Sequence, residues 1–432
     1  MAGSTQTLLR RARIVTPERT IENADLLIDA GVIARIFDSS NEQSKADAGD
    51  WSATIPFATK ERVQARTLAL QSGCSEIDLQ GQTLFPGFID VHIHGAAGVD
   101  MMEANADDLR HVGDFLARHG VTSWLPTLVP APVEQYEQAV RAIEEAMLEQ
   151  PGSLRTPARV LGVHYEGPFV NSEQCGALHR EHFRSFRTTA DLDDLPTIAE
   201  RKGMHAGGMR TQALHMMTLA PEVDGGVELI RELTKRNWIV SIGHTQASRH
   251  VLDEARAAGA HHMTHFMNAM TPLHHRDLGA VGWGLVHDDV TIDLIADGIH
   301  VDPKIVRLIV KSKGAETVSL ISDAIAAAGQ GDGDYEIWGE QISVKGGRTS
   351  NARGSIAGSV ISILDAVRLM LSLGFAESEV ALTASLNPAR LLGIDRDCGS
   401  VEEGKRADLV ALDENQKVRL TIIGGQIAWS QL

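Results

Sequence analysis

Cysteines, aromatic residues and long apolar runs are scarce in this chain of 432 residues. Its three cysteines, Cys74, Cys175 and Cys398, are odd in number and widely spaced, which excludes a disulfide framework and is typical of a reducing compartment. No stretch approaches the roughly 18 apolar residues that span a bilayer, and the N-terminus lacks an apolar segment of signal-peptide length. We therefore expect a cytoplasmic protein without a membrane partner.

Basic residues are also few. The 40 lysines and arginines face 57 acidic residues, which gives a formal net charge of −17. This balance argues against a nucleic-acid partner, because phosphate backbones are bound by an excess of positive charge. Any anionic ligand must then be held by a local basic pocket. The 43% hydrophobic and 22% charged content is ordinary for a globular chain with a full core.

The middle of the chain alternates short apolar runs with segments of helical spacing. About eight such pairs fit into roughly 300 residues, which predicts an α/β protein with a (β/α)₈ barrel. An open doubly wound sheet is the structural rival, but no glycine-rich dinucleotide or phosphate loop follows the first strand. The expected barrel strands lie in FPGFIDVHIHG, TSWLPTLVP, RVLGVHYEG, LHMMTLAPE, IVSIGHT, HHMTHF, IDLIADGIH and VSLISDA.

Both ends of the chain have the alternation and turn residues of strands. We expect a small β-sandwich domain built from residues 1–84 and 395–432, with the barrel occupying 85–394. Residues 38–76 are polar and aperiodic, and we interpret them as a surface insertion that ends in a short helix.

Histidine is abundant, with 18 copies, and several histidines and acidic residues follow the expected strands directly. The carboxyl ends of barrel strands meet at one mouth, where enzymes of this fold keep their active sites. Side chains far apart in sequence should therefore meet there: His92, His94, Glu166, His244, His265, His300 and Asp323.

His92 and His94 are two residues apart on a strand, so both imidazoles point to the same face and are able to share an ion. Imidazole with carboxylate favours zinc, iron or manganese over calcium or magnesium. Taken alone, this pair fits two partly exposed histidines at a strand end as well as it fits a metal site. Asp323 is a candidate general base, an additional metal ligand, or a cap of the following helix.

The motifs PGFIDVHIHG, HYEGPFVN, TLAPE, IGHT, THFMNAM, HHRDLGAVG, IADGIHVDP and ISDAIAAAG resemble, in order, those of the N-acetylglucosamine-6-phosphate deacetylases of the amidohydrolase superfamily. The resemblance covers nearly the whole chain except 38–76 and a stretch near 187–212. It implies metal-dependent hydrolysis of the acetamide of N-acetyl-D-glucosamine 6-phosphate, which yields D-glucosamine 6-phosphate and acetate. It also implies a homodimer.

The resemblance assigns roles to individual residues. Glu166, His244 and His265 match the ligands of the divalent ion found in all members, and His92 with His94 match a pair that in some members helps to hold a second ion near Asp323. The resemblance therefore implies one or two ions per subunit. Asp323 matches the catalytic acid/base. Asn268, Ala269 and His300 match residues of the substrate site, and Arg276 matches an arginine that in family members reaches the phosphate bound in the neighbouring subunit. We add Ala177, and His275 as a minor contact near the phosphate, as candidate substrate residues.

One position departs from the family pattern. Leu178 stands where a histidine often follows Gly-Ala, and His179 comes one place later, which puts the grip on the substrate in question. Cys175 in the same loop is either a redox-sensitive lid residue or an ordinary thiol, and we favour the ordinary thiol.

The alternative functions are deacetylation of another N-acyl amino sugar, such as N-acetylgalactosamine 6-phosphate, and a non-catalytic barrel scaffold. Without the resemblance, Arg276 suggests only a surface ion pair with Asp277.

Overall fold

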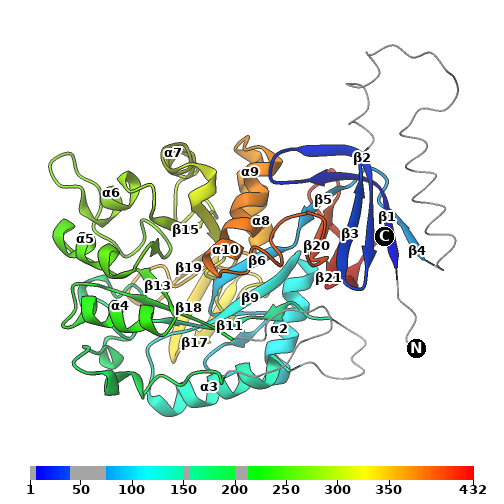
Figure 1. Ribbon diagram of the computed structural model, residues 1–432. Helices are drawn as coiled ribbons and strands as arrows, with labels where there is room; N and C mark the ends of the chain where they lie inside the picture. Colours follow the sequence, from blue (N-terminus) through cyan, green and yellow to red (C-terminus); the bar gives the residue numbers. More distant parts are fainter. Residues whose placement is uncertain (1–5, 39–73, 149–155, 200–212) are drawn as a thin grey trace, which may run out of the picture.

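A computed structural model describes residues 6–38, 74–148, 156–199 and 213–432, and its main body is a parallel barrel (Figure 1). The eight expected strands form one sheet, in which β6 pairs with β9 and the others follow in chain order. The predicted barrel is therefore confirmed. Its strands are β6 (Phe88–Ile93), β9 (Val121–Leu128), β11 (Gly162–Glu166), β12 (Leu214–Leu219), β13 (Ile239–Ile242), β14 (His262–Met263), β15 (Thr291–Ile295) and β16 (Val318–Ile321). The short strand β10 (Arg159–Val160) comes just before β11 in the chain and pairs in parallel with β9.

The barrel strands are buried on both faces, as expected for a parallel sheet covered by helices. Every residue of β6, β9, β11 and β16 is buried. Helices enclose the barrel and bury apolar side chains beneath them; α4, for example, buries Leu229, Ile230 and Leu233. The helices are α2 (Ala106–Arg118), α3 (Val133–Ala146), α4 (Gly226–Lys235), α5 (Arg249–Ala258), α6 (Gly279–Val286), α7 (Pro303–Lys313), α8 (Ile363–Ser372), α9 (Glu377–Ala381) and α10 (Asn387–Leu391).

The two chain ends share a second sheet of eight strands beside the barrel (Figure 1). Its residues alternate: Leu84 and Leu409 enter the core of this sheet, whereas Phe85 and Val410 belong to the main core of the barrel. The prediction that both chain ends build a β-rich domain is confirmed, and its limits at residues 84 and 395 stay predictions. Its strands are β1 (Thr7–Val15), β2 (Thr20–Asp29), β3 (Val32–Phe37), β4 (Ser75–Asp78), β5 (Thr83–Pro86), β20 (Leu409–Leu412), β21 (Val418–Ile423) and β22 (Gln426–Ser430).

The expected insertion at 38–76 lies largely outside the described residues. Its end was predicted wrongly, because residues 75–76 belong to β4, which pairs in parallel with β1. Ser75 donates its backbone N–H to the carbonyl of Gln6, so the polar composition here reflects an exposed strand rather than a loop.

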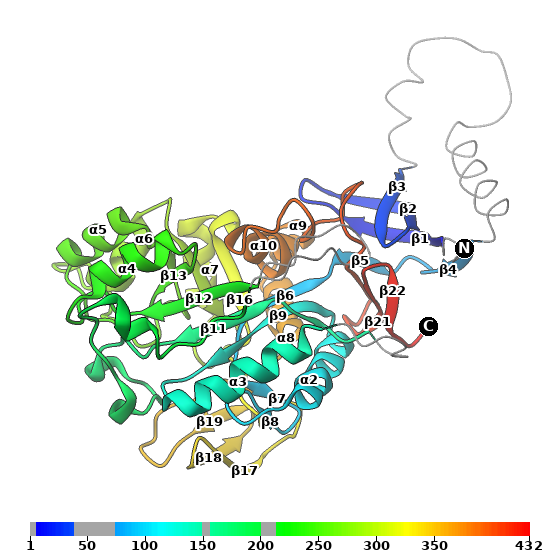
Figure 2. The same ribbon diagram turned by 60° about the horizontal axis from the view of Figure 1, so that its bottom comes forward.

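Two small sheets lie at the end of the barrel where the strands finish (Figure 2). One is the pair β7 (Gly95–Ala96) and β8 (Val99–Asp100), and the other contains β17 (Gly333–Ile337), β18 (Glu340–Lys345) and β19 (Arg348–Ser350). Backbone bonds from Ala97 and Gly98 to Ala328 and Ala326 join the first sheet to the segment that follows β16. Among the described residues, no helix is long and apolar enough to cross a membrane.

The barrel closes between its first and last strands through side chains and loop backbone. Asp90 in β6 accepts a hydrogen bond from the Ser322 hydroxyl at 2.6 Å, and the backbone N–H of Asp323 donates to the His92 carbonyl at 2.9 Å. Burial raises the pKa of Asp90 to about 7, while the Ser322 bond opposes that rise. Because this seam carries His92 and Asp323, it sets the distance between the first and last parts of the site.

Replacing Ser322 by alanine leaves a buried carboxylate oxygen without its donor, so we expect a loss of about 1–3 kcal/mol in stability. Since the folded-state pKa of Asp90 lies above its unfolded value, its ionisation costs stability as the pH rises from about 4 through about 7. The Ser322→Ala loss should therefore be larger at about pH 8 than at about pH 6. Thermal unfolding at the two pH values measures it. Ser378→Ala in α9 is the matched control, and equal losses at both pH values would contradict the assignment.

Candidate active site

The expected strand-end residues converge at one mouth of the barrel. His92 lies within β6 and His94 directly after it, and Glu166 is the last residue of β11. His244, His265 and Asp323 each stand two residues beyond their strands, β13, β14 and β16.

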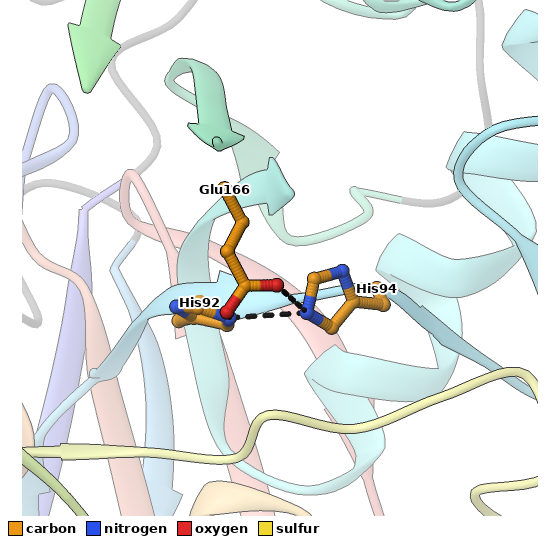
Figure 3. A group of neighbouring side chains, drawn as sticks. All are labelled: His92, His94 and Glu166. Atoms are coloured by element: carbon orange, nitrogen blue, oxygen red, sulfur yellow. Dashed lines mark hydrogen bonds and ion pairs between the residues drawn. The ribbon is translucent and has the colours of Figure 1, made fainter. Parts of the chain in front are cut away.

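Glu166 lies at the centre of this group. Its Oε1 atom is 2.9 Å from His244 Nε2 and 3.0 Å from His265 Nε2. Its Oε2 atom is 3.2 Å from His94 Nε2, and His92 Nε2 lies 3.5 Å from Oε1. Figure 3 shows the carboxylate between the rings of His92 and His94. Glu166 and the four imidazoles are nearly withdrawn from solvent.

Two of the imidazoles are held in a defined tautomer by backbone carbonyls. His94 Nδ1 donates to the Thr127 carbonyl at 3.1 Å, and His244 Nδ1 donates to the Gln174 carbonyl at 2.7 Å. A carbonyl only accepts, so these Nδ1 atoms carry protons, and each ring offers the lone pair of its Nε2 atom to a metal ion once that atom has lost its own proton. Such outer partners commonly orient metal-binding histidines.

The Nε2 atoms that face the centre of the site are better suited to binding a cation than to contacting one another. His92 and His94 Nε2 are 3.0 Å apart, and so are His244 and His265 Nε2, with the Glu166 carboxylate beside both pairs. Lone pairs and carboxylate oxygens directed at a common point repel unless a proton or a metal ion lies between them. Within the described residues, two groups have their ligand atoms within 4.8 Å of one another: His92, His94 and Glu166, and Glu166, His244 and His265. The cluster is therefore able to hold a metal ion.

The ionisation of the site follows from burial opposed by charge. Burial alone would raise the pKa of Glu166, but His92, His244 and His265 hold it well below its usual range. Burial lowers the pKa of His92. For His94, the bonds to Asp323 and Glu166 outweigh burial and raise the pKa to about 10. The carboxylate at the centre is thus charged, as a cation ligand must be.

Three residues of the site have left-handed backbone conformations. The φ angles of His244, His265 and Asp323 are +48°, +29° and +49°. Such φ values are uncommon in residues other than glycine, and strained positions tend to cluster at functional sites. The turn after each strand bends the side chain back over the mouth, which is how residues beyond the strand ends reach a common point.

Asp323 lies at the edge of the cluster. Its Oδ1 atom is 3.3 Å from His94 Nε2 and 3.5 Å from His92 Nε2. Its side chain is 12% exposed, against 5% for Glu166, so it lies between the buried group and the mouth. The expectation that Asp323 stands next to the candidate metal position agrees with this geometry, while its role as base remains a prediction.

The predicted substrate residues lie on loops around the same mouth. Asn268 and Ala269 follow His265 in a turn in which Met267 and Ala269 have positive φ angles, and Asn268 Nδ2 donates to the His265 carbonyl at 3.2 Å. His300 Nδ1 lies 2.7 Å from Asp297 Oδ2. Sequence reasoning overlooked Asp297, although it belongs to the quoted motif IADGIH.

His275 and Arg276 are exposed on the loop between Asn268 and α6. Within the described part of the chain, the Arg276 guanidinium forms no ion pair with Asp277 or another carboxylate. The simpler interpretation as a surface salt bridge is therefore wrong. On this exposed loop, a guanidinium with no ion pair among the described residues is available to an anion or to a neighbouring subunit.

The loop after β11 covers His244. It contains Cys175, which is a buried free thiol that accepts a hydrogen bond from Arg180 Nε at 3.2 Å. Leu178 is buried in the main core, so the departure from the family pattern is an apolar anchor of this loop. His179 Nδ1 lies 3.2 Å from Glu181 Oε1. The Ala177 carbonyl accepts from Arg353 at 3.4 Å.

The fold and the site define an amidohydrolase. Residues 83–428 match the Amidohydrolase family, and the chain belongs to it. The chain is 38% identical to the N-acetylglucosamine-6-phosphate deacetylase of Bacillus subtilis (strain 168), over 98% of this chain and 97% of that protein. It is 36% identical to the N-acetylgalactosamine-6-phosphate deacetylase of Escherichia coli O157:H7, over 98% and 99%.

Solved structures agree with these relatives. The N-acetylglucosamine-6-phosphate deacetylase of Thermotoga maritima superposes with a TM-score of 0.79 at 30% identity, covering 98% of this chain and 100% of that one. A mutant of the Mycobacterium smegmatis enzyme, in complex with N-acetyl-D-glucosamine-6-phosphate, gives a TM-score of 0.77 at 27% identity, covering 99% and 100%.

Glu166→Gln removes the charge shared by both candidate metal groups with little change in shape. We expect purified protein with little bound metal and a lower melting temperature, because an ion that binds only the folded state stabilises it. Metal analysis and thermal unfolding, each with and without a chelator, measure both effects. The chelator should lower the melting temperature of the original protein and of the surface control Glu137→Gln, and leave Glu166→Gln unchanged. Full metal content in Glu166→Gln would remove Glu166 from the ligand set.

Proposed function

We propose that the protein hydrolyses the acetamide of N-acetyl-D-glucosamine 6-phosphate to D-glucosamine 6-phosphate and acetate. The observation that carries this proposal is the Glu166 carboxylate among four imidazoles with Asp323 Oδ1 at 3.3 Å from His94, in a chain similar to phosphorylated amino-sugar deacetylases over 98% of its length. The donor set suits amide hydrolysis assisted by a divalent ion.

We assign Glu166, His244 and His265 to one ion, and His92, His94 and Asp323 to a second position next to it. Imidazole and carboxylate donors favour zinc, iron or manganese. A bound divalent ion supplies positive charge that polarises the acetamide carbonyl and acidifies water. Thr127 and Gln174 fix the rings of His94 and His244 through their carbonyls, so the site needs little reorganisation to bind.

Asp323 is the proposed general base and acid. Its carboxylate takes a proton from the attacking water as the new C–O bond forms, and then gives that proton to the sugar nitrogen as the C–N bond breaks. The products are a carboxylic acid, which ionises to acetate, and the free amine. The position of Asp323 between the buried imidazoles and the mouth supports this assignment.

The phosphate is the proposed partner of Arg276. A guanidinium forms paired hydrogen bonds with phosphate oxygens, and a chain of net charge −17 needs such a local cation. Asn268 and Ala269 line the same side, with His275 as a minor contact, and His300 and Ala177 are proposed to contact the sugar. Arg276 lies on an exposed loop, which supports the proposal that it reaches the active site of the neighbouring subunit in a homodimer.

A second candidate substrate is N-acetylgalactosamine 6-phosphate. The similarity to the Escherichia coli relative, which covers 98% of this chain, favours this epimer. The two sugars differ in the orientation of one hydroxyl group, so the metal and phosphate positions serve either substrate.

A panel of phosphorylated and free N-acetylglucosamine and N-acetylgalactosamine tests the proposal. With metal quantified in the same sample, we expect the highest kcat/KM for N-acetylglucosamine 6-phosphate. Preference for the galactosamine epimer selects the second candidate. Equal rates on free sugars would contradict the phosphate assignment. If the protein holds no metal and gains no activity when metal is added, the alternative of a non-catalytic barrel scaffold is correct.

Arg276→Ala should raise KM for the phosphorylated substrate at least about tenfold and change kcat little, since a charged hydrogen-bonded contact is lost at a remote group. Arg141→Ala on α3 is the surface control.

Mixing Arg276→Ala subunits with inactive Asp323→Asn subunits tests the subunit arrangement. If Arg276 acts across the dimer, random mixing rebuilds about a quarter of the sites. No recovery in mixed dimers places Arg276 in its own active site.

A further inference from the structure

Trp338 occupies an unusual backbone position at the tip of the hairpin between β17 and β18. Ile337 pairs with Glu340, so Trp338 and Gly339 form a two-residue turn, with φ angles of +54° and +71°. Glycine, asparagine and aspartate are the usual residues of such turns. A bulky residue with positive φ is a backbone outlier, and such outliers persist where the surrounding structure demands them.

The side chain of Trp338 reaches the candidate metal centre. Its ring lies edge to face against the ring of His94, with centroids 5.4 Å apart and planes at 87°. It packs against both the barrel core and the core of its own hairpin. The indole therefore forms part of the wall beside His94.

The polar atom of this side chain has no partner. Trp338 Nε1 is buried and donates no hydrogen bond within the described part of the chain. By contrast, the indole of Trp124 donates to the Ala158 carbonyl, and that of Trp283 donates to Asp253. A buried N–H without an acceptor is costly, so its presence beside a reaction site indicates an acceptor that arrives with a ligand.

The hairpin is anchored so that its tip stays in place. Glu340, two residues after Trp338, accepts from Asn351 Nδ2 at 3.3 Å and lies 3.6 Å from Arg353. Thr349 in β19 donates to the Gly358 carbonyl at 2.7 Å, and Ser359 N–H donates to the Asp323 carbonyl at 2.7 Å. The hairpin is thus tied to the backbone of Asp323.

We propose that Trp338 contacts the substrate: its ring walls the site beside His94, and its Nε1–H donates a hydrogen bond to an oxygen atom of the bound N-acyl amino sugar. This inference rests on the proposed function. The contact fixes the substrate relative to the hairpin, and hence relative to Asp323, without any role in holding the metal.

The test removes the N–H and keeps the ring. Trp338→Phe and, as a closer match, β-(3-benzothienyl)alanine at position 338, in which sulfur replaces N–H, are compared with Trp429→Phe on the terminal sheet. We expect kcat/KM for N-acetylglucosamine 6-phosphate to fall at least about tenfold in both variants at position 338, and to stay unchanged in Trp429→Phe. Metal content and melting temperature should be those of the original protein.

Binding is measured separately in the Asp323→Asn background, where turnover is expected to be lost. Calorimetry with N-acetylglucosamine 6-phosphate should show a larger Kd, that is weaker binding, when the benzothienyl residue is present. Unchanged kcat/KM and Kd would mean that water satisfies the indole, and this overturns the inference. A fall in kcat/KM that accompanies lost metal or a lower melting temperature assigns Trp338 a structural role and also overturns it. An original protein inactive on every phosphorylated sugar contradicts the proposed function instead.

Discussion

The electrostatic relation between one buried carboxylate and the imidazoles around it governs the architecture of the site. Glu166 is withdrawn from water and has a strongly lowered pKa, so its negative charge must be balanced by positive charge inside the barrel. Without a metal ion, the protonated imidazole of His94 contributes part of that balance, since its pKa is raised to about 10. A divalent ion offers the same balance more completely, and it uses the lone pairs that the Thr127 and Gln174 carbonyls direct inward.

The barrel frame holds each of these groups within about 3.5 Å of a neighbour in the cluster, as His92 is held near Glu166 and Asp323. Closure of the seam by Asp90 and Ser322 sets β6 against β16, and the left-handed turns at His244, His265 and Asp323 bring residues beyond the strand ends inward. Strain in these turns is tolerated because the strands beneath them are buried on both faces and do not shift.

Much of this organisation could be predicted from sequence because the signals are local. Each barrel strand is a short apolar run, and histidine or acidic residues after such runs predict a shared mouth whatever the details of packing. The partners of those residues could not be predicted in the same way. The carbonyls of Thr127 and Gln174 belong to the backbone, which leaves no mark in the sequence. Trp338 lies more than 240 positions from His94, and its place in a turn depends on tertiary contacts that override its own backbone preference.

The central claim is that one inorganic cation is clasped by Glu166, His244 and His265. Diffraction from crystals of the metal-loaded protein, recorded at the absorption edge of the bound element, locates that cation directly. The account predicts an anomalous peak about 2.0–2.2 Å from one Glu166 oxygen and from the Nε2 atoms of His244 and His265. A peak elsewhere, or a fully active protein with no peak at this position, would contradict it.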